Sequence, residues 1–219
     1  MYFKNRVDAG IRLAKELEAK YRYENTVVMS LSDGGIVIGE QIARRLHCSI
    51  TMLYTDPIVL PGDGKTIVGT IDQSGNMTYD KMIPTAQLDE FITEFHGFFD
   101  QQRIEKMHHL NTLISRAGKA SPDILRGHNV IVTTDGAPTG AQFDAAISYL
   151  KTIAVDRVIA AVPVASEMAV DRLHVLFDEL HCLSVAQNYV STDHYYEHPT
   201  IADHDELMNK IDDIIDKWE

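Results

Sequence analysis

The residues best suited to chemistry follow an apolar stretch in the second half of the chain. Val130 to Thr133 has the pattern of a buried strand, and it delivers Asp135 to a loop that holds Thr139 and Gly140 before a helical pattern begins. Free backbone N–H groups at a helix start attract a phosphate, and glycine lets the backbone approach it closely. Asp135 has the chemistry to accept hydrogen bonds from sugar hydroxyls. The pattern suits a sugar phosphate, although an Asp-Gly turn followed by a Thr N-cap would explain the same residues without a ligand.

The elements that must position this loop alternate along the chain. The expected strands cover 26–31, 50–54, 130–133, 157–164 and 180–185, and the expected helices cover 4–22, 35–46, 140–153 and 166–177, followed by an amphipathic terminal helix. Continuous apolar strands separated by helices predict an α/β fold with a doubly wound, mostly parallel sheet. Ligands of such sheets bind beyond the carboxyl ends of the strands, where a second glycine turn, 32–35, is also expected.

Residues 56–118 interrupt the alternation. The segment is rich in Pro, Gly, Asp and Thr as far as residue 83, with short strand patterns over 66–71 and 76–79. A strongly helical stretch over 85–117 follows, with a phenylalanine stripe that suits a core or a dimer face. The segment is too short for a core of its own, so we expect a small hood within a single domain over 1–219.

Composition excludes several classes of partner. The formal net charge is −12, from 20 basic and 32 acidic residues, and such a surface repels nucleic-acid phosphates. No apolar run approaches the ~18 residues of a transmembrane helix, and the N-terminus lacks an apolar signal core. Cys48 and Cys182 have no partner at metal-motif spacing. We therefore expect a cytoplasmic protein with no nucleic-acid or membrane partner.

The segment 130–141 resembles the phosphoribosyl pyrophosphate (PRPP) motif of type I phosphoribosyltransferases: an apolar strand, two acidic positions, three variable residues and Thr-Gly. Other stretches are similar to a bacterial branch of that family, in the same order. They are Arg6-Val7-Asp8-Ala9-Gly10-Ile11-Arg12-Leu13-Ala14 in the opening helix, Ser32-Asp33-Gly34-Gly35 at the pyrophosphate loop, Val68-Gly69-Thr70-Ile71 in the hood, Ser115-Arg116-Ala117-Gly118 before the motif and Ala161-Val162-Pro163-Val164 after it. The resemblance covers residues 3–185.

This resemblance implies a set of site residues and partners. Asp135 and Thr134 would act at the ribose, and the PRPP 5-phosphate would lie on Ala137, Pro138, Thr139, Gly140, Ala141 and Gln142. The pyrophosphate loop would be Asp33, Gly34 and Gly35, with possible hood cations at Arg103, Lys106 and Arg116. The resemblance further implies a phosphorylated ribose substrate, Mg²⁺ held indirectly by Asp135, a role in nucleotide metabolism and a homodimer. For each hood cation, a solvated helix face is the alternative.

Several positions depart from the family pattern. Thr134 replaces the first acid of the motif; neutral hydrogen bonds contribute about 1 kcal/mol against roughly 1.5–3 for charged ones, so the change costs on the order of tenfold in affinity or rate. Asp33 replaces the Arg of the pyrophosphate loop, and a carboxylate ~4 Å from a phosphate charge is repelled by about 4 kcal/mol at a dielectric near 20. Gln142 replaces a Thr, and Pro138 stands where purine-specific members carry an acid.

Three functional hypotheses follow from these residues. The leading one is a phosphoribosyltransferase that uses PRPP and Mg²⁺ with an unknown acceptor. The second is a non-catalytic module that binds a nucleotide or a ribose phosphate and regulates another process. The third is a hydrolase of a ribose phosphate in which Asp33 and Asp135 share a metal. No role is predicted for the His- and Tyr-rich C-terminal tail.

Overall fold

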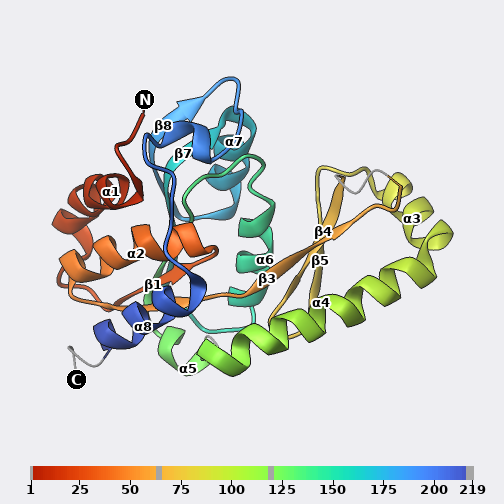
Figure 1. The fold of residues 1–219 in the computed structure, drawn as a ribbon, viewed down its shortest axis with the longest axis horizontal. Coiled ribbons are helices and arrows are strands. Elements are labelled where there is room, and N and C mark those ends of the chain that lie inside the picture. Colours follow the sequence, from red (N-terminus) through yellow and green to blue (C-terminus); the bar gives the residue numbers. More distant parts are fainter. Residues whose placement is uncertain (1, 63–65, 118–120, 216–219) are drawn as a thin grey trace.

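A five-stranded parallel sheet forms the centre of the fold (Figure 1). The structure is a computed structural model that describes residues 2–62, 66–117 and 121–215. The sheet contains β1 (Thr26–Ser30), β2 (Ser49–Met52), β6 (Asn129–Thr133), β7 (Arg157–Ser166) and β8 (Glu179–Ala186). Their order is β2-β1-β6-β7-β8, and every neighbouring pair is parallel.

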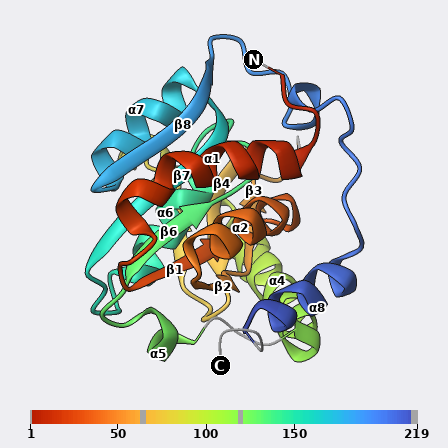
Figure 2. The same cartoon turned by 90° about the vertical axis from the view of Figure 1, so that its left-hand side faces the viewer.

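Helices cover both faces of this sheet. Helices α1 (Arg6–Tyr21) and α2 (Asp33–Leu46) lie on the face seen in Figure 2. Helices α6 (Ala141–Leu150) and α7 (Glu167–Leu176) cover the opposite face, and the short α5 (Pro122–Leu125) precedes β6. Alternate strand residues enter two cores: Val28 and Ile131 pack with α1 and α2, whereas Val27 and Val130 pack with α6 and α7. The predicted doubly wound α/β fold is confirmed.

The hood projects from one side of the sheet and has its own antiparallel strands (Figure 1). It contains β3 (Thr55–Val59), β4 (Ile67–Asp72), β5 (Met77–Tyr79), α3 (Thr85–Glu94) and α4 (His96–Ala117). Strand β3 was not predicted because Pro57 weakens the strand pattern, but β3 lies at the edge of its sheet, where proline is tolerated. The helix expected over 85–117 is divided at Phe95. The ring of Phe95 packs edge-to-face on Phe99, which is buried, so part of the phenylalanine stripe belongs to the core.

The C-terminal part of the chain crosses the carboxyl edge of the sheet and returns beside α2 (Figure 2). We call residues 187–203 the strap; it contains a short 3-10 helix (Asp193–Tyr195) and leads into α8 (His204–Ile215). The strap is tied to the N-terminus, because Phe3 N donates to Tyr195 O at 2.9 Å. Leu207 and Ile211 of α8 are buried, as the terminal stripe predicted, while Trp218 of that stripe lies outside the described residues. Across the described ranges, no helix combines the length and apolar character needed to cross a membrane.

Candidate functional site

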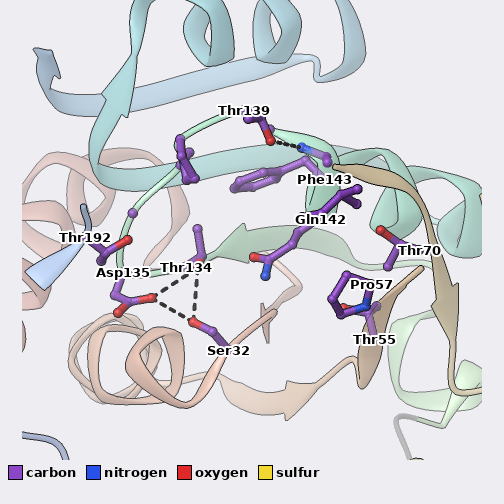
Figure 3. Close-up of a pocket in the computed structure, with 16 residues that line it drawn as sticks. Ser32, Thr55, Pro57, Thr70, Thr134, Asp135, Thr139, Gln142, Phe143 and Thr192 are labelled. Atoms are coloured by element: carbon purple, nitrogen blue, oxygen red, sulfur yellow. Dashed lines mark hydrogen bonds between the residues drawn. The ribbon is translucent and has the colours of Figure 1, made fainter. Parts of the chain in front are cut away.

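The site lies where the strand order changes direction. Strands β1 and β6 are neighbours, but the chain leaves β1 toward β2 and leaves β6 toward β7. The two connections therefore diverge above the carboxyl ends of the strands, which is where doubly wound sheets bind ligands. A cavity of about 230 Å³ opens at this point (Figure 3). Its walls are the loop 134–140, the start of α6, Ser32, Thr192 and residues of β3 and β4.

The loop that follows β6 presents free backbone N–H groups. Its carbonyl groups are used elsewhere: Ala137 O accepts from Ser166 N at 3.0 Å, Pro138 O accepts from Ser166 Oγ at 2.7 Å, and Thr139 O accepts from Arg172 Nη1 at 3.2 Å. In contrast, the backbone N–H groups of Thr139, Gly140 and Gln142 have no acceptor among the described residues. Unpaired donors at a helix start, with the helix dipole behind them, suit an anion.

Gly140 makes this geometry possible. It is the N-cap of α6, its φ is 74°, and no side chain caps the helix there. Glycine adopts this left-handed conformation without the strain that a Cβ would introduce. The six residues predicted to hold the 5-phosphate, 137–142, all line the cavity.

Asp135 is the acid at the predicted sugar end of the cavity, and the protein holds its side chain at both carboxylate oxygens. Oδ2 accepts from Arg6 Nε at 2.8 Å, and Oδ1 accepts from Ser32 Oγ at 2.8 Å. Tyr196 Oη donates to the backbone carbonyl of Asp135 at 2.6 Å. Burial raises the pKa of Tyr196 well above its ordinary value, so the phenol remains a donor. Asp135 is therefore an oriented carboxylate with a defined set of partners.

Thr134 faces the same cluster (Figure 3). Its Oγ1 lies 3.0 Å from Ser32 Oγ and donates to Asp135 Oδ1 at 3.3 Å. Ser32 is also the N-cap of α2, because its Oγ accepts from Gly35 N at 2.9 Å. The hydroxyl groups of Thr134 and Ser32 thus connect the two glycine turns.

Apart from Ser32, the second glycine turn lies outside the cavity wall. Asp33, the first residue of α2, points to the C-terminal helix, where its Oδ1 lies 2.7 Å from His204 Nδ1. Gly34 packs on the Asp135–Arg6 pair, since a Cβ at Gly34 would lie 2.7 Å from Arg6 Nε and closer still to the Asp135 carboxylate. Among Ser32, Asp33, Gly34 and Gly35, only Ser32 lines the cavity.

The hood supplies a neutral wall. Thr55, Pro57, Ile67 and Thr70 line the cavity from β3 and β4. The predicted hood cations lie elsewhere: Lys106 Nζ pairs with Asp56 Oδ1 at 2.9 Å, and Arg103 lies in a separate groove along α4. The side chain of Arg116 falls outside the described residues. Within the described lining, Asp135 is the one charged side chain.

Comparison with known proteins decides the family. The model of the family "Phosphoribosyl transferase domain" matches residues 2–197. The chain belongs to this family. Two proteins of Mycobacterium tuberculosis, from strains CDC 1551 / Oshkosh and ATCC 25618 / H37Rv, are each named "Putative phosphoribosyl transferase" and are 24% identical to it over 211 residues. The match covers 96% of this chain and 46% of each relative, so the chain spans about half the length of the curated relatives it matches.

A solved structure has the same fold. The crystal structure of TT1426 from Thermus thermophilus is similar with a TM-score of 0.74 and 26% sequence identity, over 96% of this chain and 98% of that chain. The predicted membership of the type I phosphoribosyltransferase family is confirmed by the family match. In this phosphoribosyl transferase domain, the loop 134–140 is the segment on which the resemblance to the PRPP motif rested.

Several residues of the domain's site were missed from the sequence. Ser32 carried a weak signal, because a Ser before Asp-Gly-Gly is a good N-cap. Arg6, Arg172 and Thr192 carried none: each approaches the loop from a distant part of the chain. Among the described residues of this phosphoribosyl transferase domain, no group of three or more His, Cys, Asp or Glu side chains could hold a metal ion.

Proposed function

We propose that the loop 136–142 binds the 5-phosphate of PRPP and that the protein transfers the phosphoribosyl group to an acceptor. The observation that carries this proposal is the set of unpaired N–H groups at Thr139, Gly140 and Gln142. Backbone donors held rigidly by the surrounding fold bind a phosphate without any reorganisation of the loop. The family match supports the general activity. A single domain over 1–219 and a cytoplasmic homodimer are part of this proposal.

Asp135 is the proposed partner of the ribose hydroxyls. It lines the cavity beside the phosphate loop, and its carboxylate is an acceptor that the neutral Thr134 cannot replace. The family generally uses Mg²⁺, which prefers one or two carboxylates together with substrate phosphates and water. A single carboxylate in the cavity fits a metal held mainly by the substrate, with Asp135 acting through the ribose. When bound, Mg²⁺ would neutralise charge on the leaving pyrophosphate.

The position of Asp33 supports PRPP as the substrate. A carboxylate directed at the pyrophosphate would repel it, but the Asp33 side chain is directed at His204 of α8. Asp33 does not line the cavity, so the repulsion of pyrophosphate that the sequence predicted for this carboxylate does not apply. The same geometry disfavours the hydrolase hypothesis, because Asp33 is paired with His204 and Asp135 with Arg6.

A second candidate function is a non-catalytic module that binds a nucleotide or a ribose phosphate. The observation that favours it is the charge of the described lining, where Asp135 is the one charged side chain and no cation faces the expected place of the pyrophosphate. A monophosphate needs only the backbone cradle, whereas a pyrophosphate carries more charge that must be neutralised.

Calorimetry with PRPP and with ribose 5-phosphate, each with and without Mg²⁺, separates the two candidates. Binding of PRPP that depends on Mg²⁺, together with release of pyrophosphate when candidate acceptors are added, supports the transferase. Preference for ribose 5-phosphate or a nucleotide, independent of Mg²⁺, supports the non-catalytic module. Absence of binding to all of these ligands, with Asp135→Ala behaving like wild type, would overturn the site itself.

A further inference from the structure

Arg6, at the start of α1, lies beneath the sugar end of the cavity. We propose that Arg6 is a positioning residue that orients the Asp135 carboxylate toward the ribose, and that the strap holds Arg6 in place for this purpose. This inference rests on the proposed function, because it concerns the same site. It assigns a role both to the opening helix and to the C-terminal tail, for which the sequence predicted none.

The contact between Arg6 and Asp135 is short, buried and directional. Arg6 Nε donates to Asp135 Oδ2 at 2.8 Å, and Nη2 lies 2.8 Å from the same oxygen. The two side chains are 6% and 14% exposed. Since Ser32 holds the other oxygen, the carboxylate is fixed at two points and cannot rotate freely. Arg6 itself does not line the cavity, so any effect on a ligand passes through Asp135.

The strap holds the far side of the guanidinium. Arg6 Nη2 donates to Asp193 Oδ1 at 2.6 Å, and Nη1 donates to the carbonyl of Pro199. The guanidinium carbon stands 4.7 Å from the centre of the Tyr196 ring, a cation–π distance. Burial by itself would lower the pKa of Arg6, but the hydrogen bond to Asp193 and the charge of Asp135 outweigh it and raise the pKa. Arg6 is therefore a permanent cation shared between the motif and the strap.

The strap also closes the sugar end directly. Thr192 lines the cavity, and its Oγ1 lies 2.9 Å from Tyr189 Oη. The strap lies so close to the loop that a Cβ at Gly136 would be 2.8 Å from Thr192 Cγ2. Asp135 and Thr192 both line the cavity at its sugar end. Thr192 belongs to the strap, and Asp135 is held by Arg6, which the strap contacts.

A positioning role makes a prediction that general destabilisation does not. Loss of Arg6 should weaken the part of binding that depends on the ribose and spare the part that depends on the phosphate, because Ser166 and Arg172, not Arg6, hold the carbonyl groups of the phosphate loop. The ratio of the affinities for ribose 5-phosphate and inorganic phosphate therefore isolates the role of Arg6.

The test uses calorimetry on the full chain with ribose 5-phosphate and with inorganic phosphate. Arg6→Gln should weaken binding of ribose 5-phosphate by about tenfold, the loss expected for one charge-assisted hydrogen bond, and change phosphate binding by less than about twofold. Arg6→Lys should bind ribose 5-phosphate with an affinity between those of wild type and Arg6→Gln, because an ammonium keeps the charge but cannot reproduce the forked hydrogen bonds of the guanidinium. Arg22→Gln is the matched control. Arg22 caps the opposite end of the same 16-residue helix and pairs with Glu18, so both affinities should equal those of wild type.

Asp193→Asn is the second variant, and it decides the matter if Arg6→Gln does not fold. It leaves Arg6 and Asp135 in place but removes the charge of the strap carboxylate that pairs with Arg6, and it should weaken ribose 5-phosphate binding selectively. An unchanged affinity ratio in the variants that fold, or an equal loss for both ligands, would overturn the inference alone. Wild-type protein that binds neither ligand would overturn the proposed function and this inference with it.

Discussion

Substitution of Gly34 by Ala tests the closest packing in the site. A Cβ at Gly34 would lie 2.7 Å from Arg6 Nε and closer still to the Asp135 carboxylate, separations that real Cβ atoms essentially never show. The nearest atoms belong to the side chains of Asp135 and Arg6, so the carboxylate must move, and its hydrogen bonds to Arg6 and Ser32 must lengthen or break.

The size of the effect follows from three contributions. Alanine in place of glycine in a helix gains about 1 kcal/mol. Overpacking costs about 1–3 kcal/mol, and loss of one charge-assisted hydrogen bond costs about 1.5–3 kcal/mol. The free energy of unfolding should therefore fall by about 1.5–5 kcal/mol, and ribose 5-phosphate should bind at least ~10-fold more weakly because Asp135 is displaced.

Urea unfolding and calorimetry measure these two quantities. Gly97→Ala is the matched control, because Gly97 lies in the first turn of α4 and a Cβ there meets no atom within 4 Å. That variant should be as stable as wild type or slightly more stable, with unchanged ligand binding. If Gly34→Ala matched wild type in both measurements, Gly34 would not pack on the Asp135–Arg6 pair and the described geometry of the sugar end would be wrong.

Three further predictions concern the phosphate loop and the ion pairs. Gly140→Ala forces a Cβ into a residue with φ of 74°, so we expect a loss of about 1–2 kcal/mol in urea unfolding and weaker binding of inorganic phosphate; equal stability would refute the strained cap. Arg172→Met leaves the Asp144 side chain, which is 2% exposed, without its main counter-charge, so unfolding should become easier by about 3–5 kcal/mol, and adding Asp144→Asn should restore part of the loss. The hydrogen bond from Lys20 lowers the pKa of Glu179, so this carboxylate stabilises the fold above its ordinary pKa and the contribution disappears as pH falls through the lowered value. Glu179→Gln should therefore lower the urea midpoint slightly at neutral pH but not in acid below the lowered pKa of Glu179, and a difference that persists there would contradict this account.

The sequence carried enough information for most of the elements. The buried strands, β1 and β6 among them, are continuous apolar runs, and the helices that follow show a clear helical period. Such patterns depend only on local spacing and on burial of one or both faces. Strand β3 was missed because Pro57 contradicts the local strand pattern, and only pairing with β4 at the sheet edge makes it a strand.

The same distinction between local and long-range information applies to the candidate site. The chemistry of the loop 134–140 depends on residues that are neighbours in sequence, so this loop could be proposed as a phosphate cradle from the sequence alone. The orientation of Asp33 could not, because it depends on His204, which is 171 positions away. The sequence showed an acid in the pyrophosphate turn, and only the tertiary structure decided that this acid points to another helix.

By itself, the sequence determined the α/β fold class, the family and the loop that suits a phosphate, because these follow from local periodicity and from a contiguous motif. The tertiary structure alone decided what surrounds that loop. Arg6 comes to Asp135 from 129 positions before it, and Tyr196 comes from 61 positions after it. Contacts over such separations are set by how α1 and the strap pack across the sheet edge. No pattern of neighbouring residues encodes them, and they determine how the acid proposed to bind the sugar is held.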